Sequence, residues 1–135
     1  MIGLVVITHG QLAVEFLRTA EMIIGPIGGC RAISIDRNSS VDEATVSLRQ
    51  AIAEVGGDDE GVLILTDMFG GTPTNIAADF LAGGRIDILT GINLPMLIKA
   101  ARARYQRDLT ELAELLREYG QQAILRPADL LNNKK

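Results

Sequence analysis

The sequence contains no tryptophan, one cysteine and one histidine among its 135 residues. A single cysteine, Cys30, cannot form an internal disulfide, so the sequence favours a reducing compartment. Cys30 begins an apolar segment, which favours a place in the hydrophobic core over thiol chemistry. Because no apolar run approaches the ~18 residues that span a bilayer, and no charged flank precedes the apolar N-terminus, we expect a cytoplasmic protein.

Positive charge and aromatic residues are also scarce. The formal net charge is -4 and aromatic residues make up 4% of the chain, so no basic stretch interleaved with aromatics is available to bind nucleic acid. Nucleic acid is therefore not an expected partner. The hydrophobic share of 47% and the charged share of 22% are typical of a globular protein, and the length fits one domain.

Short apolar segments alternate with segments whose apolar residues recur at helical spacing. The runs 2–7 and 62–65 lack polar alternation, as strands covered on both faces do. Strands are predicted at 2–7, 31–35, 62–65 and 86–89, and helices at 11–24, 40–55, 74–81, from 93 onward and at 108–120. This rhythm predicts a single α/β domain with an open, doubly wound and mostly parallel sheet. The 86–89 strand is more alternating and so belongs nearer an edge.

Several predicted helices carry end signals. Ser40 and Glu43 form a capping box, Asn93 and Asp108 suit the N-cap position, and Gly83-Gly84 is expected to end the 74–81 helix. Four cations follow Asn93 late in its helix, and cations at a helix C-terminus on a solvated face are the favoured interpretation over a functional cluster. They are Lys99, Arg102, Arg104 and Arg107.

The candidate functional residues cluster where the predicted strands end. Loops at the carboxyl ends of parallel strands share one edge of the sheet, and three of them begin Thr8-His9-Gly10, Thr66-Asp67 and Thr90-Gly91. His9 exchanges protons or attacks as a nucleophile near neutral pH. Glycines in these loops, Gly10, Gly70 and Gly71 among them, let backbone N–H groups face an anion. An imidazole, a carboxylate and an anion cradle are the groups needed to carry a phosphoryl group on nitrogen.

Each of these residues also has a purely structural interpretation. A lone histidine is often structural, and Asp67 could simply cap its own loop. The Gly70-Gly71-Thr72-Pro73 segment is not a Walker P-loop, because no G-K-[ST] follows. No cluster of metal-ligand residues is evident, so the sequence predicts neither a metal nor a cofactor.

Three segments together resemble a known family. I-T-H-G, L-T-D-M-F-G-G-T-P-T-N and T-G-I-N-L-P-M-L follow strands in this order. They resemble the enzyme IIA domain of the mannose-family (mannose/fructose/sorbose) phosphoenolpyruvate-dependent sugar phosphotransferase system. The resemblance covers essentially the whole chain. It implies that His9 accepts a phosphoryl group from the phosphocarrier HPr and passes it to a IIB domain, that Asp67 orients the imidazole, and that the Thr72 hydroxyl lies near the phosphoryl group.

The resemblance also has consequences for assembly. It implies a homodimer in which a C-terminal strand, here within 121–125, is exchanged. The IIA-like domain would span 1–126, and 127–135 would be a polar tail. Because the sequence ends shortly after that strand, we expect IIB to be a separate protein and any association with membrane permease components to be indirect.

Three other functions compete with this interpretation. A histidine phosphatase or mutase is disfavoured, because Thr8 stands where that chemistry requires an arginine and there is no second histidine. A regulatory sensor that binds a partner according to the phosphorylation of His9 stays open, as does a phosphotransfer subunit of a dihydroxyacetone kinase. The transported sugar is not encoded here, since membrane and IIB components select it.

Overall fold

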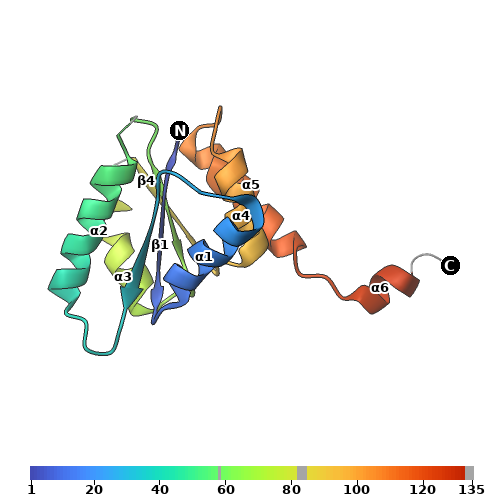
Figure 1. Ribbon diagram of the computed structural model, residues 1–135, viewed down its shortest axis with the longest axis horizontal. Helices are drawn as coiled ribbons and strands as arrows, with labels where there is room; N and C mark the ends of the chain where they lie inside the picture. The colour runs from blue at the N-terminus through green and yellow to red at the C-terminus, as the bar shows by residue number, and fades with distance from the viewer. Residues whose placement is uncertain (58, 82–84, 133–135) are drawn as a thin grey trace.

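The computed structural model is a parallel sheet with helices on both faces (Figure 1). The structure describes residues 1–57, 59–81 and 85–132. Its sheet has the strand order β2-β1-β3-β4. The strands are β1 (Gly3–His9), β2 (Cys30–Ile35), β3 (Val62–Thr66) and β4 (Ile86–Thr90). The helices are α1 (Leu12–Ile24), α2 (Val41–Val55), α3 (Thr72–Ala78), α4 (Leu94–Ala103), α5 (Leu109–Gln122) and α6 (Pro127–Asn132). The predicted α/β class and parallel sheet are confirmed, and β4 is an edge strand as expected.

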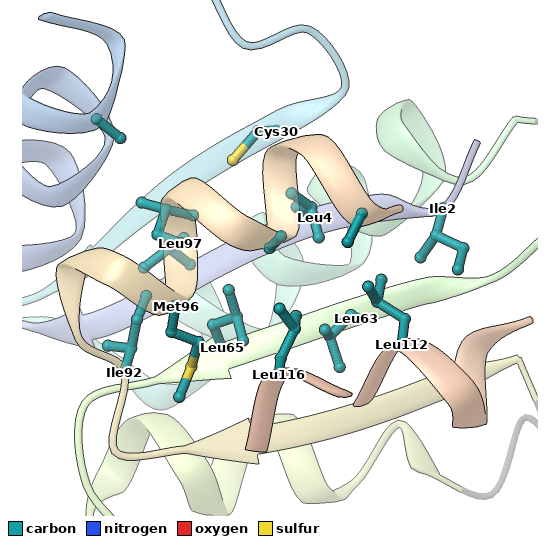
Figure 2. Close-up of a cluster of buried hydrophobic side chains, with 14 of the residues drawn as sticks. Ile2, Leu4, Cys30, Leu63, Leu65, Ile92, Met96, Leu97, Leu112 and Leu116 are labelled. Carbon is teal, nitrogen blue, oxygen red and sulfur yellow. The ribbon is translucent and has the colours of Figure 1, made fainter. Parts of the chain in front are cut away.

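Each face of the sheet has its own apolar layer. Helices α1, α4 and α5 cover one face, while α2 and α3 cover the other (Figure 1). Along β1, Leu4 and Val6 point into the first layer, which Figure 2 shows against α4 and α5, and Val5 and Ile7 point into the second. All four side chains are fully buried. The lack of polar alternation in β1 is thus explained, because both of its faces are covered.

The central position of β1 determines what lies at its carboxyl end. Parallel pairing places Ile7 opposite Thr66 of β3 and His9 opposite Ile35 of β2. The loop after β1 is therefore flanked by the loops after β2 and β3. Sheet register alone brings residues 9, 36 and 67 to one edge, although they are far apart in sequence.

The predicted N-caps are confirmed. The side chains of Ser40, Asn93 and Asp108 accept hydrogen bonds from backbone N–H groups three residues later, at 3.2, 2.9 and 2.8 Å. These bonds satisfy N–H groups that lack a partner within the helix.

Two helices differ from their predicted bounds. Helix α3 begins at Thr72 rather than 74, since Pro73 suits a first turn, and it ends at Ala78; the predicted Gly83-Gly84 stop lies outside the described residues. Helix α5 continues past Gly120, where its end was predicted. This glycine serves close packing instead, because a Cβ there would lie 2.5 Å from the Met96 Cε.

The predicted C-terminal strand is wrong for the single chain. Residues 121 and 122 form the last turn of α5, and 123–126 have no regular structure. The expected polar tail contains α6, which lies away from the sheet and its covering helices (Figure 1). A strand needs a partner edge for its backbone groups, and this segment pairs with none of the described strands.

Arg104 is buried, whereas the sequence predicted that it lies on a solvated face at the end of α4. Its side chain is 2% exposed, and its guanidinium donates to the Gly28 and Gly29 carbonyl oxygens, the latter at 3.2 Å. Arg102 and Arg107 are exposed as predicted. The buried guanidinium ties the end of α4 to the loop between α1 and β2.

Cys30 is buried in the core, as predicted. Burial raises the pKa of its thiol to about 12, against a smaller lowering by the nearby Arg104 charge.

Among the helices of the described chain, none has the length and apolar character needed to traverse a bilayer.

Candidate functional site at the carboxyl edge of the sheet

His9 and Asp67 are in direct contact. His9 is the last residue of β1, and Asp67 directly follows β3. The Nδ1 of the imidazole lies 2.8 Å from the Asp67 Oδ2, and the His9 backbone N–H donates to the same oxygen at 3.1 Å. One carboxylate oxygen therefore holds both the ring and the main chain of His9.

This contact determines the tautomer of His9. A carboxylate accepts hydrogen bonds, so the proton of a neutral imidazole lies on Nδ1 and leaves Nε2 with a free lone pair. The His9 side chain is 47% exposed, whereas that of Asp67 is 12% exposed. The imidazole of His9 is thus open to a partner, while the carboxylate beside it is shielded.

The electrostatics keep Asp67 ionised. Burial by itself raises the pKa of the carboxyl, but hydrogen bonds from the His9 ring and backbone, together with the His9 charge, bring the pKa below its ordinary value of 3.8. A further bond from the Met68 backbone N–H to Oδ1, at 3.1 Å, engages the second oxygen. A negative charge is therefore held beside Nδ1 at neutral pH.

Gly71, the N-cap residue of α3, packs against the imidazole. A Cβ at this position would lie 2.7 Å from the His9 Cε1 and 3.3 Å from Nε2, which is too close for any other residue without movement of the ring. The preceding Gly70 has φ +84°, a left-handed conformation that favours glycine. Local geometry thus favours glycine at both positions, at Gly71 because of the ring contact and at Gly70 because of the turn.

A cleft of about 530 Å³ opens beside His9. Thr72 and Gly10 line it, so the predicted hydroxyl does share a cavity with the imidazole. The Gly10 N–H, however, already donates to the Ile35 carbonyl oxygen at 2.9 Å. Gly10 has φ +56°, and its role in this conformation is to turn the chain rather than to offer an N–H group.

Sequence reasoning missed the residues that hold these loops. The Thr8 hydroxyl accepts the Ala13 N–H at 2.7 Å, next to the start of α1. The Thr74 hydroxyl lies 2.7 Å from the Thr66 hydroxyl and donates to the Met68 carbonyl oxygen at 2.7 Å. Threonines at strand ends were visible in the sequence, but their partners were not. The third predicted loop does not join the site, because Thr90 and Gly91 line a different cavity from the one that His9 lines.

In the described ranges, no group of three or more His, Cys, Asp or Glu side chains is arranged to hold a metal ion. The functional groups at this edge are therefore the imidazole, the carboxylate and the loops around them.

The comparison with known families matches this arrangement. A family model described as "PTS system fructose IIA component" matches residues 3–116, which include every residue of the site. The chain belongs to this family. Its members are phosphoryl carriers of sugar phosphotransferase systems, and a carrier role in sugar uptake is favoured over the sensor and dihydroxyacetone kinase alternatives.

Individual proteins similar to this chain are also named as EIIA or EIIAB components. The chain is 31% identical over 125 residues to a fructose-specific EIIA component from Bacillus subtilis, covering 92% of this chain and 85% of that protein. It is 29% identical over 125 residues to a mannose-specific EIIAB component from Escherichia coli, covering 91% of this chain but only 38% of the relative. An EIIA crystal structure from Streptococcus agalactiae superposes with a TM-score of 0.85 at 25% identity, covering 96% of this chain and 99% of that one.

Proposed function

We propose that His9 accepts a phosphoryl group from phospho-HPr on Nε2 and passes it to a IIB protein. The observation that carries this proposal is the 2.8 Å contact between the His9 Nδ1 and the Asp67 Oδ2, which leaves Nε2 unprotonated on a side chain that is 47% exposed. Family membership implies HPr and IIB as donor and acceptor. Such a carrier works in the cytoplasm and reaches membrane permease components only through IIB.

The proposed step balances without any further reactant. The Nε2 lone pair attacks phosphorus, a bond from Nε2 to phosphorus forms, and the bond from phosphorus to the donor atom breaks with its electron pair leaving on HPr. Positive charge develops on the imidazole as Nε2 uses its lone pair. The Asp67 carboxylate stabilises that charge and retains the proton on Nδ1. The reverse sequence of events delivers the group to IIB.

The surrounding loops would hold the oxygens of the transferring group. Thr72 lines the cleft beside His9, and its hydroxyl is the proposed donor. Gly70 and Gly71 would present backbone N–H groups to the same oxygens, while Gly10 shapes the turn. Support for these assignments is the cleft that Thr72 and Gly10 share with His9, and the 3.3 Å between a Cβ at Gly71 and the His9 Nε2.

Phosphorylation mapping tests the proposal directly. After incubation with phosphoenolpyruvate, enzyme I and HPr, mass spectrometry at alkaline pH should find one phosphoryl group on His9, which mild acid removes. His9→Ala should take up none, whereas substitution of Cys30 by serine is the control and should not alter uptake. Full incorporation into the His9→Ala variant would refute the proposal. Adding candidate IIB proteins then shows whether the label moves onward or stops at His9, as it would in a sensor.

We also propose that the protein is a homodimer joined through its C-terminal segment. Ile124, Leu125 and Leu131 are 81%, 65% and 67% exposed in the single chain. Ile124 also lines a cavity next to the end of β4, a strand whose outer edge is unpaired in the described sheet. A second copy that supplies this segment would cover both the apolar side chains and the strand edge.

A further inference from the structure

Arg37 occupies a place in the cleft that the proposed chemistry does not yet use. It follows β2 in the turn before α2, and it lines the same cleft as His9, Gly10 and Thr72. Of the residues that line this cleft, all within the described part of the chain, Arg37 alone carries a positive charge. We propose that Arg37 binds the phosphoryl group carried on the Nε2 of His9, which makes it a residue that stabilises the phosphorylated state. This inference rests on the proposed function of His9.

The turn that bears Arg37 is fixed relative to His9. His9 lies opposite Ile35 in the sheet, and the Gly10 N–H donates to the Ile35 carbonyl oxygen at 2.9 Å. The turn itself is closed by two hydrogen bonds between Asp36 and Ser39. The Asp36 N–H donates to the Ser39 hydroxyl at 2.9 Å, and the Ser39 N–H donates to the Asp36 carbonyl oxygen at 3.0 Å. Arg37 is therefore presented from a braced turn beside the imidazole.

The Arg37 guanidinium is available for a new contact. Its side chain is exposed, and within the described ranges it forms neither an ion pair nor a hydrogen bond. Two other exposed arginines are already paired, Arg18 with Glu15 and Arg126 with Asp129. A guanidinium can donate two parallel N–H bonds to phosphate oxygens, so it fits a phosphoryl group better than an ammonium does.

Phosphorylation would add negative charge to a site that already holds carboxylates, and a cation would stabilise it. A phosphoryl group brings close to two negative charges next to the carboxylate of Asp67, and the Asp36 carboxylate lines the same cleft. Like charges at this spacing disfavour the phosphorylated state. A cation that reaches the phosphoryl oxygens offsets this repulsion only after transfer, so it shifts the equilibrium toward phosphorylated His9.

The equilibrium constant for phosphoryl transfer from phospho-HPr to His9 distinguishes a residue that binds the phosphoryl group from a residue that only docks HPr. The constant is the ratio of phosphorylated to free chain divided by the ratio of phospho-HPr to HPr, measured with the proteins dissociated. A residue that only docks HPr changes the forward and reverse rates together and leaves this constant unchanged. A residue that binds the phosphoryl group in the isolated carrier changes the constant itself.

The experiment compares Arg37→Ala, Arg37→Lys and the control Arg85→Ala with the unsubstituted protein. Arg85 is also exposed but precedes β4, at the opposite edge of the sheet from His9. We expect Arg37→Ala to lower the equilibrium constant about three- to tenfold at low salt, the range for a partly exposed charge-assisted contact. Arg37→Lys should give a smaller decrease, and the difference should shrink as added salt screens the charges.

An equilibrium constant within twofold of the unsubstituted value in Arg37→Ala would overturn the inference, whatever happens to the rates. An equal decrease in Arg85→Ala would also overturn it, since the effect would then come from net charge. Failure of the proposed function looks different, because the unsubstituted protein would take no phosphoryl group on His9.

Discussion

The Oδ2 of Asp67 accepts two hydrogen bonds from one residue, from the ring Nδ1 of His9 at 2.8 Å and from its backbone N–H at 3.1 Å. The other oxygen, Oδ1, accepts the Met68 N–H at 3.1 Å. The side-chain amide of an asparagine here has only one oxygen, so it can accept the hydrogen bonds of His9 or that of Met68, but not both. The carboxylate is thus needed for its two acceptors as well as for its charge.

Asp67→Asn should therefore impair transfer while preserving the fold. The amide leaves developing positive charge on the imidazole without its counter-charge, and a loss on the order of 10² to 10³ in rate is expected, less than the 10⁴ of the serine-protease precedent. Rapid-quench transfer from phospho-HPr measures the rate, and the melting temperature should stay within a few degrees. Asp79→Asn, on the exposed end of α3, is the matched control. An unchanged rate, or an unfolded protein, would return Asp67 to a capping role.

Acid should remove the stabilisation that Asp67 provides. Its pKa is lowered in the folded protein, so its contribution is fully present above its ordinary value of 3.8 and is lost as pH falls through the folded pKa. The difference in unfolding free energy between the unsubstituted protein and Asp67→Asn should be constant at neutral pH and should narrow only below about pH 4. Urea titrations at several pH values measure it. A difference that narrows between pH 7 and 5 would contradict the lowered pKa.

Gly71→Ala should misplace the imidazole. The added methyl group would lie 2.7 Å from the His9 Cε1, so the ring must move away from its position against Asp67. Displacement on the order of 1 Å costs up to about 10² in rate. The backbone of Gly71 has φ -88°, which alanine adopts readily, so stability should change little. Gly57→Ala is the control, because a Cβ there meets nothing within 4 Å. If Gly71→Ala transfers at the normal rate, Gly71 is not required for ring placement.

Arg104→Ala should destabilise the protein without slowing transfer. The substitution leaves the Gly28 and Gly29 carbonyl oxygens without their donor and opens space at a 2% exposed site, for an expected loss of about 2–4 kcal/mol. Arg102→Ala, exposed on the same helix, should stay within about 0.5 kcal/mol of the unsubstituted protein. Urea unfolding measures both. Equal stability of the two variants would show that the buried guanidinium contributes nothing net.

Removal of residues 123–135 should convert a dimer to a monomer that stays folded. Helix α5 packs through Leu112 and Leu116 and ends at Gln122, so truncation after this residue spares the core. Light scattering reports the mass, and circular dichroism reports the helices. A truncated protein that is still dimeric would contradict the proposed role of the C-terminal segment.

Much of this architecture could be predicted from the sequence because it depends on local patterns. Apolar runs in β1 and β3, and the caps Ser40, Asn93 and Asp108, act over a few residues and were placed correctly. His9 and Asp67 could be assigned to one edge of the sheet, since parallel strands align their carboxyl ends. Their motifs also resembled those of the phosphotransferase IIA family, to which the chain belongs.

Other features depended on partners distant in sequence. Arg104 resembled its exposed neighbours, and only the approach of the loop at Gly28 and Gly29 made it a buried residue. Gly120 looked like a helix end, but contact with Met96 gave it a packing role within the helix. The segment after Gln122 looked like a strand, yet a strand needs an edge to pair with, and in the single chain this segment pairs with none of the described strands.

The sequence by itself determined the order of strands and helices through α5 and the chemical groups at the site, because periodicity, capping and side-chain type are local properties. Tertiary structure alone decided that one Asp67 oxygen binds both donors of His9, that Gly71 contacts the ring, and that Arg37 shares the cleft. These relationships depend on sheet register and loop packing at distances of a few ångströms, which no local pattern specifies.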